Sequence, residues 1–395
     1  MRILVLTSAV PYPPYGGGQL RMFSILRHLA RDHTVDLVSL ATQDELAHQA
    51  PLARVCHEVM FLPRPARPTG FRRWTTAFQN LALLRAYEAD PGIQGVVADV
   101  AARNYDVIQV ENGYMIPYAA SLPGVPRTLD IFGMWSGGLW REVAARRRPL
   151  DRVRVVVDWT KAKRVERGLS RVFDAVYVVS EGDRAYLSAI DRRLRIHVVP
   201  NGVDADYFTP FPAPEPPPVH LVFTGAMDYA PNEDAALFFH QQMLPRLIER
   251  LGDVRFWVVG RDPGPALAKL ARDPRVTMTG AVEDVRPYLA RATVVVVPIR
   301  FGSGTRIKVL EALAMRKAVV STRAGAEGLP VVSGEHLVLA DSPEAFAGAV
   351  ERLARDPAER ERLGRTGRAL VAAAYDWRIT LAPMSRALLE LNGRG

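Results

Sequence analysis

The sequence has little cysteine and no long hydrophobic run, and each shortage removes a class of protein. Among 395 residues there is one cysteine, Cys56, which excludes an intramolecular disulfide framework and a multi-cysteine zinc site. We interpret Cys56 as a core residue in a reducing compartment. No apolar run approaches the roughly 20 residues that span a bilayer, and the first run is too short for a secretory signal. We therefore expect a cytoplasmic protein, either free or peripheral at the inner face of the membrane.

Patterns for metal ions and nucleic acids are also missing. The eight histidines show no metal-ligand spacing such as His-Glu-x-x-His, so we expect no metal site. The net charge of +9 is not accompanied by a nucleic-acid recognition motif, so we expect no nucleic-acid partner.

Most of the positive charge lies in residues 141–171. This stretch holds eleven Lys/Arg and four Asp/Glu, an excess of seven out of nine for the whole chain. With Trp135, Trp140 and Trp159 nearby, it has the composition that attracts an anionic membrane surface. Two interpretations stay open at this point: peripheral membrane contact, or a solvated helix face in an arginine-rich protein.

The overall composition is that of a globular protein with more than one domain. Hydrophobic residues make up 48% and charged residues 24% of the chain, which is ordinary globular usage. The length predicts two or three domains. The segment TPFPAPEPPP, residues 209–218, contains six prolines and can form neither a helix nor a central strand. We predict a stiff linker there, between two halves of similar size.

Both halves alternate buried strands with helices, which predicts an α/β fold of two Rossmann-like, doubly wound domains. Ligands of such domains bind beyond the carboxyl ends of the strands. The predicted strands are RILVLTS (2–8), TVDLVSLA (34–41), YDVIQV (105–110), RTLDIF (127–132), AVYVVS (175–180), RIHVVP (195–200), HLVFTGA (220–226), VRFWVVG (254–260), VTMTG (276–280), TVVVVPI (293–299) and AVVSTR (318–323).

The segment after one of these strands has the pattern of a phosphate-binding turn. Residues 298–322 run strand, glycine-rich turn, helix, strand. Gly302 and Gly304 would let the backbone approach a ligand closely, and Thr305 is a plausible N-cap. The N-terminus of a helix attracts a phosphate through its free N–H groups and its dipole.

Side chains at the start of this helix add to the pattern. Arg306 and Lys308 place two cations in its first turn, and Glu311, one turn further on, could accept hydrogen bonds from a ribose diol. Together they indicate a nucleoside diphosphate ligand. The alternative is that Lys308 and Glu311, spaced i,i+3, pair with each other on the surface.

These residues belong to a set of motifs that resembles a known family. The chain is similar over nearly its whole length to the retaining, nucleotide-sugar-dependent glycosyltransferases of family 4, which share the GT-B architecture of two facing Rossmann-like domains. The matching motifs are GGGQLR (16–21), VVSEGD (178–183), VVPNGVDADYF (198–208), FTGAMDYAPNEDA (223–235), VVGRDP (258–263), TGAVEDVRPYLARA (279–292) and GSGTRIKVLEALAM (302–315).

The resemblance implies a domain plan and a set of site residues. Residues 1–208 would bind the acceptor, residues 219–375 the donor nucleotide, and a helix within 376–395 would pack back on the first domain. No cofactor or metal is implied, since the nucleoside diphosphate sugar is a substrate. The implied donor-binding residues are Gly16, Gly17, Gly18, Gly225, Arg261, Ser303, Gly304, Thr305 and Glu311, with Arg306 and Lys308 neutralising the leaving diphosphate.

Two positions depart from the family pattern. Ser303 stands where the common motif has a glutamate, eight positions before Glu311, that contacts the transferred sugar. Phe132 follows a strand after which many relatives have a histidine. Asp130, or alternatively Glu111, is a candidate for the missing polar role near the sugar, while an N-cap or a loop salt bridge is the competing interpretation of either acid.

We therefore expect a retaining glycosyltransferase that acts on a glycan, a lipid-linked sugar or a small-molecule acceptor. A nucleotide-sugar epimerase of the same architecture and a non-catalytic sugar-nucleotide-binding subunit remain as alternatives. Beside the same site, Tyr229, Pro231 and Asn232 begin another predicted helix, where we interpret Asn232 as an N-cap.

Overall fold

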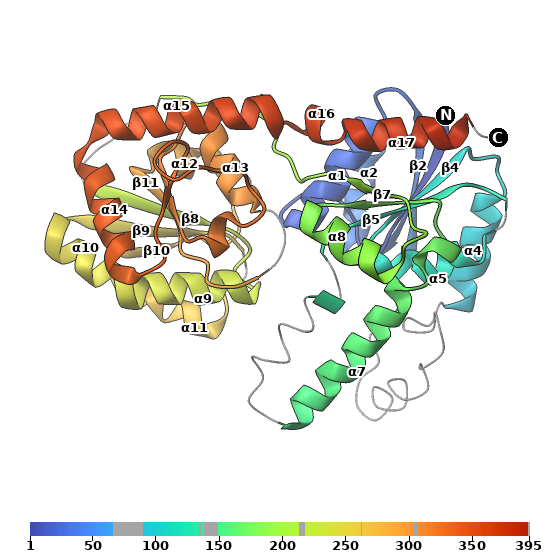
Figure 1. The fold of residues 1–395 in the computed structure, drawn as a ribbon, viewed down its shortest axis with the longest axis horizontal. Helices are drawn as coiled ribbons and strands as arrows, with labels where there is room; N and C mark the ends of the chain where they lie inside the picture. The colour runs from blue at the N-terminus through green and yellow to red at the C-terminus, as the bar shows by residue number, and fades with distance from the viewer. Residues whose placement is uncertain are drawn as a thin grey trace. The chain divides into compact units, whose positions relative to one another are not determined.

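The chain folds into two compact units (Figure 1), which we describe from a computed structural model. One unit comprises Met1–Pro200 and Leu381–Gly395, and the other comprises Asn201–Thr380. The structure describes residues 1–65, 90–122, 124–133, 136–137, 149–212, 218–261, 263–302 and 306–393, without the side chains of 149–154.

The described part of the first unit contains a parallel seven-stranded sheet in the order β3-β2-β1-β4-β5-β6-β7. Its strands are β1 (Arg2–Thr7), β2 (Thr34–Ala41), β3 (Glu58–Pro63), β4 (Val107–Glu111), β5 (Arg127–Ile131), β6 (Ala175–Val178) and β7 (Ile196–Val198). Its helices are α1 (Gly17–Leu29), α2 (Gln49–Leu52), α4 (Pro91–Ala101), α5 (Ile116–Ala120), α7 (Pro149–Glu166), α8 (Glu181–Ile190) and α17 (Ala382–Asn392), with short 3₁₀ turns η1 (Asp44–His48), η2 (Gly113–Met115) and η3 (Leu169–Arg171).

The two faces of this sheet differ in polarity. The strands are nearly continuous apolar runs, as expected for a parallel sheet covered on both sides. On one face, side chains of β1, β4, β5 and β6 form an apolar core with α4, α5 and α8. On the other face the last row of residues is polar, and Thr7, Glu111 and Asp130 lie side by side in register. Helix α1 covers this polar row, because Arg21 binds Asp130 there.

The second unit repeats the same architecture with a parallel six-stranded sheet, ordered β10-β9-β8-β11-β12-β13 in its described part. The strands are β8 (Val219–Thr224), β9 (Val254–Val259), β10 (Val276–Met278), β11 (Val294–Val297), β12 (Val319–Ser321) and β13 (Val338–Leu339). The helices are α9 (Ala230–Phe238), a π-helical turn η4 (Phe239–Met243), α10 (Leu244–Leu251), α11 (Pro265–Ala268), α12 (Arg286–Arg291), α13 (Ile307–Ala314), α14 (Pro343–Arg355), α15 (Pro357–Ala374) and α16 (Trp377–Thr380), with the 3₁₀ turns η5 (Leu270–Arg272) and η6 (Ala324–Ala326).

Aromatic residues fill both faces of the second sheet. Successive side chains of β9 point to opposite faces. The ring of Phe256 packs against Phe239, 4.5 Å away between centroids. The next residue, Trp257, meets Tyr288 of α12 at 5.4 Å on the other face. Both faces of this sheet are therefore covered, and its loops are left to bind ligands.

The strand orders confirm the predicted fold class, with two Rossmann-like units. The second compact unit begins at Asn201, and the chain returns to the first unit at Leu381. A pair of backbone hydrogen bonds joins Asn201 and its neighbours to the second unit: the N–H of Val203 donates to Tyr375, and the N–H of Trp377 donates to Val203.

Candidate active site

The candidate site residues gather where each strand order reverses. In the first unit β1 and β4 are neighbours, although the chain runs from one to the other through β2 and β3. In the second unit β8 and β11 stand in the same relation. Loops that leave the carboxyl ends of such strand pairs diverge and open a crevice. Both reversals are thus candidate positions for a ligand site.

In the second unit, a glycine after β8 makes room for a lysine from α13. A Cβ atom on Gly225 would lie 2.6 Å from Lys308 Nζ, and the φ angle of Gly225 is +151°. Lys308 Nζ donates to Asn232 Oδ1 at 2.7 Å and lies 4.2 Å from the centroid of the Phe223 ring. Gly225 is therefore required both by its backbone conformation and by the space that the ammonium group occupies.

The environment of Lys308 makes its charge easy to remove. Burial against the loop and the positive charge of Arg306 lower the pKa of Lys308 to about 7, while Glu311 raises it in part. Glu311 shows the opposite shift, because burial raises its pKa to about 7 despite Lys308. In the described part of the chain, Lys308 donates to a neutral amide rather than forming the predicted surface ion pair with Glu311. That competing interpretation is therefore wrong.

Arg306 lies just before α13 and is only 6% exposed. Its Nε donates to the carbonyl of Ala324 at 3.2 Å, and its guanidinium is 3.9 Å from Glu327. A Cβ atom on Gly302, whose φ angle is +121°, would lie 3.2 Å from this guanidinium. Two basic residues therefore lie within one turn of each other at the start of α13.

The interpretation of Asn232 as an N-cap is wrong. Helix α9 begins after Tyr229 without a side-chain cap. The Asn232 side chain instead donates to the carbonyl of Ala226 at 2.8 Å and accepts from Lys308. It thus links the loop after β8 to α13. The asparagine at the third helical position, where a cap is not expected, was the available signal in the sequence.

The structure describes only some of the other predicted donor-binding residues. Arg261 lies beside the loop after β8, where its guanidinium is 3.5 Å from Asp228. Ser303, Gly304 and Thr305 lie outside the described residues.

In the first unit, α1 begins inside the glycine loop. Gly16 is the N-cap in an extended conformation, Gly17 is the first helical residue, and the first turn carries no acidic side chain. A Cβ atom on Gly18 would lie 3.1 Å from the ring of Phe132, which follows β5. The loop therefore exposes the positive end of a helix dipole at the carboxyl edge of β1.

The two candidate acids of this unit lie together but below the surface. Asp130 and Glu111 end neighbouring strands, and both are fully buried. Arg21 binds Asp130 through two hydrogen bonds of 2.6 Å. Neither acid is an N-cap, and the ion pair of Asp130 is formed with a helix and not within a loop. In this arrangement neither carboxyl group is exposed to a substrate.

Glu111 lies in surroundings that favour its protonated form. Burial and the neighbouring negative charge of Asp130 raise the pKa of Glu111 well above its ordinary value. Gln109 donates to Glu111 Oε1 at 3.0 Å, and Thr128 donates in turn to the Gln109 side chain. The cluster therefore pairs the charges of Arg21 and Asp130 and disfavours a second negative charge on Glu111.

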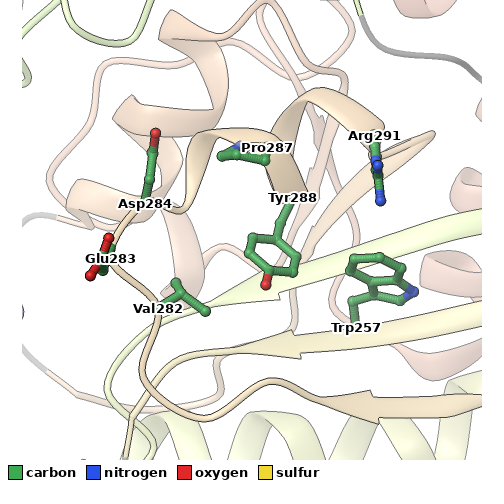
Figure 2. A pocket seen from close by; sticks show the side chains of 7 residues that line it. All are labelled: Trp257, Val282, Glu283, Asp284, Pro287, Tyr288 and Arg291. Carbon is green, nitrogen blue, oxygen red and sulfur yellow. The ribbon is translucent and has the colours of Figure 1, made fainter.

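A separate pocket of about 530 Å³ lies over β9 and α12 (Figure 2). In Figure 2 the rings of Tyr288 and Trp257 approach each other, and Asp284 points away from them. None of the predicted site residues lines it; its lining residues are Trp257, Val282, Glu283, Asp284, Pro287, Tyr288 and Arg291.

The basic stretch 141–171 is described only in part. Its described portion contains α7, in which Lys163 Nζ lies 4.8 Å from the centroid of the Trp159 ring. Trp135 and Trp140 lie outside the described residues. Within the described part of the chain, no helix combines the length and the apolar character needed to cross a membrane.

With this geometry in place, comparison with known proteins identifies the family. Residues 15–207 match the family described as "Glycosyltransferase Family 4". Residues 218–356 match the family described as "Glycosyl transferases group 1". The chain belongs to the group 1 and family 4 glycosyltransferases. The two matches divide near the boundary between the two units, so the sequence families and the structural units agree.

Curated relatives of this glycosyltransferase family match parts of the chain. A phosphatidyl-myo-inositol mannosyltransferase of Mycolicibacterium smegmatis is 28% identical over 50% of this chain and 52% of its own length. A lipopolysaccharide core biosynthesis mannosyltransferase, LpcC, of Rhizobium leguminosarum is 29% identical over 60% of this chain and 77% of its own length. The chain thus spans about half the length of the first of these relatives.

Solved structures match the whole chain in fold. Sucrose-phosphate synthase from Thermosynechococcus elongatus superimposes with a TM-score of 0.73 at 20% identity, covering 100% of each chain. Anabaena Alr3699/HepE, solved in complex with UDP-glucose, gives a TM-score of 0.67 at 16% identity, covering 99% of this chain and 100% of its own. These similarities confirm the GT-B architecture of two Rossmann-like units.

Proposed function

We propose that the protein is a glycosyltransferase that moves a sugar from a nucleoside diphosphate sugar to an acceptor hydroxyl with retention of configuration. The observation that carries the proposal is the pair of cations at the start of α13. Lys308 donates to the neutral amide of Asn232, and Arg306 donates to the carbonyl of Ala324 with Glu327 3.9 Å from its guanidinium. Their positive charge is thereby directed to the position where a nucleoside diphosphate is expected to bind.

The second unit would bind the donor. Gly225 and Gly302 would let the diphosphate approach the backbone, and Glu311 would accept hydrogen bonds from the ribose. Breaking the anomeric C–O bond transfers its electron pair to the diphosphate, so that negative charge grows there. Lys308 and Arg306 would stabilise this charge more strongly in the transition state than in the ground state.

The acceptor would attack from the face that the diphosphate leaves, which retains the configuration of the sugar. The acceptor oxygen forms the new bond to the anomeric carbon, and its proton passes to the leaving phosphate oxygen. This route needs no protein carboxylate as a nucleophile or base. It therefore agrees with the full burial of Asp130 and Glu111, and we assign neither acid a catalytic role.

The names of the relatives indicate which nucleotide sugars to test first as donors. The curated relatives are named as mannosyltransferases, and a structural neighbour was solved with UDP-glucose. We therefore propose a hexose donor carried by guanosine or uridine diphosphate, without a resident metal. The first unit would bind the acceptor: a glycan, a lipid-linked sugar or a small molecule.

The proposal is tested by thermal shift followed by product analysis. UDP, GDP, ADP and their 2′-deoxy forms are compared at equal concentration, since a ligand of the native state raises the melting temperature. We expect one ribose form to raise it more than its deoxy form. Its hexose conjugate should then release nucleoside diphosphate only when an acceptor is added. Failure of every nucleotide to shift the melting temperature would contradict the proposal.

Two other outcomes of the same assay identify different proteins. Interconversion of the sugar nucleotide without an acceptor would indicate an epimerase. Binding without release under all acceptors would indicate a non-catalytic subunit.

We also propose that a lipid-linked acceptor would bring α7 to an anionic membrane. The neighbouring Trp159 and Lys163 support this proposal, because aromatic rings and cations combine at headgroup depth. The test is co-sedimentation with vesicles containing anionic lipid, compared with neutral vesicles across a salt series. Binding that does not depend on lipid charge would contradict it.

A further inference from the structure

The glycine loop is held from two directions by one short segment at the end of β5. The segment contributes Asp130, the fourth residue of the strand, and Phe132, the first residue after it. Asp130 receives Arg21 from the second turn of α1. Phe132 contacts the first turn of the same helix at Gly18. Both contacts act on the helix start at which the glycine loop ends.

The contact between Arg21 and Asp130 is fixed in geometry. Nε and Nη2 of Arg21 donate to the two oxygens of Asp130, each at 2.6 Å, and both side chains have zero exposure. Two parallel hydrogen bonds between planar groups set orientation as well as distance. Because the ion pair is buried, neither group can exchange its partner for water without a large penalty. The second turn of α1 is thus fixed to the end of β5.

The contact between Phe132 and Gly18 sets how closely the first turn of α1 approaches the end of β5. A Cβ atom on Gly18 would lie 3.1 and 3.2 Å from two ring atoms of Phe132, which is closer than carbon atoms pack at their optimal separation. The ring therefore lies directly against the backbone of the first turn. Any side chain at Gly18 would push either the ring or the loop aside.

These two contacts explain a departure from the family pattern. Phe132 stands where many relatives have a polar histidine, and the ring is used here for packing rather than for hydrogen bonding. The carboxylate of Asp130, near the end of β5, is already paired with Arg21. The segment after β5 therefore presents a packing surface to the loop.

We propose that Arg21 and Phe132 are positioning residues that fix the conformation of the glycine loop 16–18. The inference rests on the proposed function and on the donor-binding role that the family resemblance implies for the glycine loop. Arg21 sets the orientation of α1, and Phe132 sets how closely its first turn approaches β5. Neither residue contacts the substrate. Their loss displaces the loop and slows transfer, whereas the second unit still binds the nucleotide.

The first part of the test measures the loop without any ligand. Amide hydrogen exchange of the peptide covering residues 11–22 is compared in the wild type, Arg21→Lys and Phe132→Leu. In both variants the amides of this peptide should exchange at least several-fold faster, while the exchange of β1 should stay unchanged. Arg31→Lys, an exposed position after α1, and Phe61→Leu, on the edge strand β3, are matched controls. Unchanged exchange in both Arg21→Lys and Phe132→Leu would overturn the inference, whatever the protein binds.

The second part measures transfer with the nucleotide sugar that the thermal shift selects. Gly18→Ala should lower turnover about ten-fold, because even a small displacement of a loop that positions the substrate slows the reaction. Its affinity for the bare nucleoside diphosphate should stay within about two-fold. Gly95→Ala, where an added Cβ meets nothing within 4 Å, is the matched control.

A double mutant separates positioning from general damage. If the ring and the loop are coupled, Gly18→Ala/Phe132→Ala should be faster than Gly18→Ala alone, because the smaller side chain gives the new methyl group room. Losses that simply multiply would overturn the inference. If the wild type binds no nucleotide, the proposed function fails, while the exchange measurement still decides whether the loop is held in this way.

Discussion

Each unit places a basic side chain near the reversal of its strand order, Arg21 on the helix after β1 and Lys308 on the helix after β11, yet the two units treat this charge in opposite ways. In the first unit, Arg21 is closed off by the carboxylate of Asp130 and has no exposed surface. In the second unit, Lys308 donates to the neutral amide of Asn232. A cation paired with a carboxylate has little attraction left for another anion. A cation held by neutral acceptors keeps its attraction for an anion.

The difference indicates a division of roles. The first unit uses its charges to fix a loop, and the second unit keeps its charges for a ligand. The following predictions break each arrangement in turn and are ordered by the size of the expected effect.

The largest effect is expected on breaking the buried ion pair of the first unit. Asp130→Asn leaves the guanidinium of Arg21 without a negative partner in the interior, which should cost about 3–5 kcal/mol of unfolding free energy. Urea unfolding at neutral pH measures this loss. Asp341→Asn is the matched control, since it breaks a pair with Arg323 at the surface and should change stability little. Equal, small losses in both variants would contradict the role of the pair.

Removing the cations of the second unit should affect activity more than stability. Lys308→Ala and Arg306→Ala should each reduce turnover by the equivalent of about 2–4 kcal/mol, because each stabilises charge that grows in the transition state. The measurement is the rate of nucleoside diphosphate release with folding verified by melting. Arg323→Ala, an exposed arginine in the same unit, is the control. Wild-type turnover in both variants would remove the donor-site assignment.

These sites could be predicted from the sequence only where the pattern was local. The apolar runs located most strands, and the glycine-rich turn located Arg306 and Lys308 at the start of α13. The edge strands β3 and β13 were missed, since β3 is only partly buried and β13 has two residues. The pair of Arg21 and Asp130 joins residues 109 positions apart, and no local pattern indicates such a contact. An arginine on the buried face of a helix was the one available signal.

The limits of the compact units also depend on contacts between distant residues. Six prolines in residues 209–218 exclude regular structure, but they do not determine where one compact unit ends. That is decided by the pairing of Val203 with Tyr375 and Trp377, which is a contact between distant parts of the chain.

A smaller effect on stability is expected when Glu111, which lies beside the ion pair, is replaced. The raised pKa of Glu111 in the folded state means that the folded protein holds a proton that the unfolded chain loses above about pH 4.3. Wild-type stability should therefore fall as the pH rises from there toward the folded pKa. Glu111→Gln removes this dependence, so its stability relative to wild type should grow by about 1.4 kcal/mol per pH unit in that range. Urea unfolding at several pH values measures it, and parallel curves would contradict the assignment.

The central claim, that Lys308 has no carboxylate partner and pairs with a diphosphate when one binds, is tested most directly by calorimetry of nucleotide binding. The pKa of Lys308 is lowered to about 7, so at about pH 8 the amine is mostly neutral until an anion binds and raises its pKa. Titration of UDP and GDP in two buffers of different ionisation enthalpy measures the protons taken up. Glu311→Gln serves as the control, because the pKa of Glu311 is also about 7. We predict that at least one nucleotide binds with uptake approaching one proton, retained in Glu311→Gln and lost in Lys308→Met. Binding without proton uptake by the wild type would contradict the account.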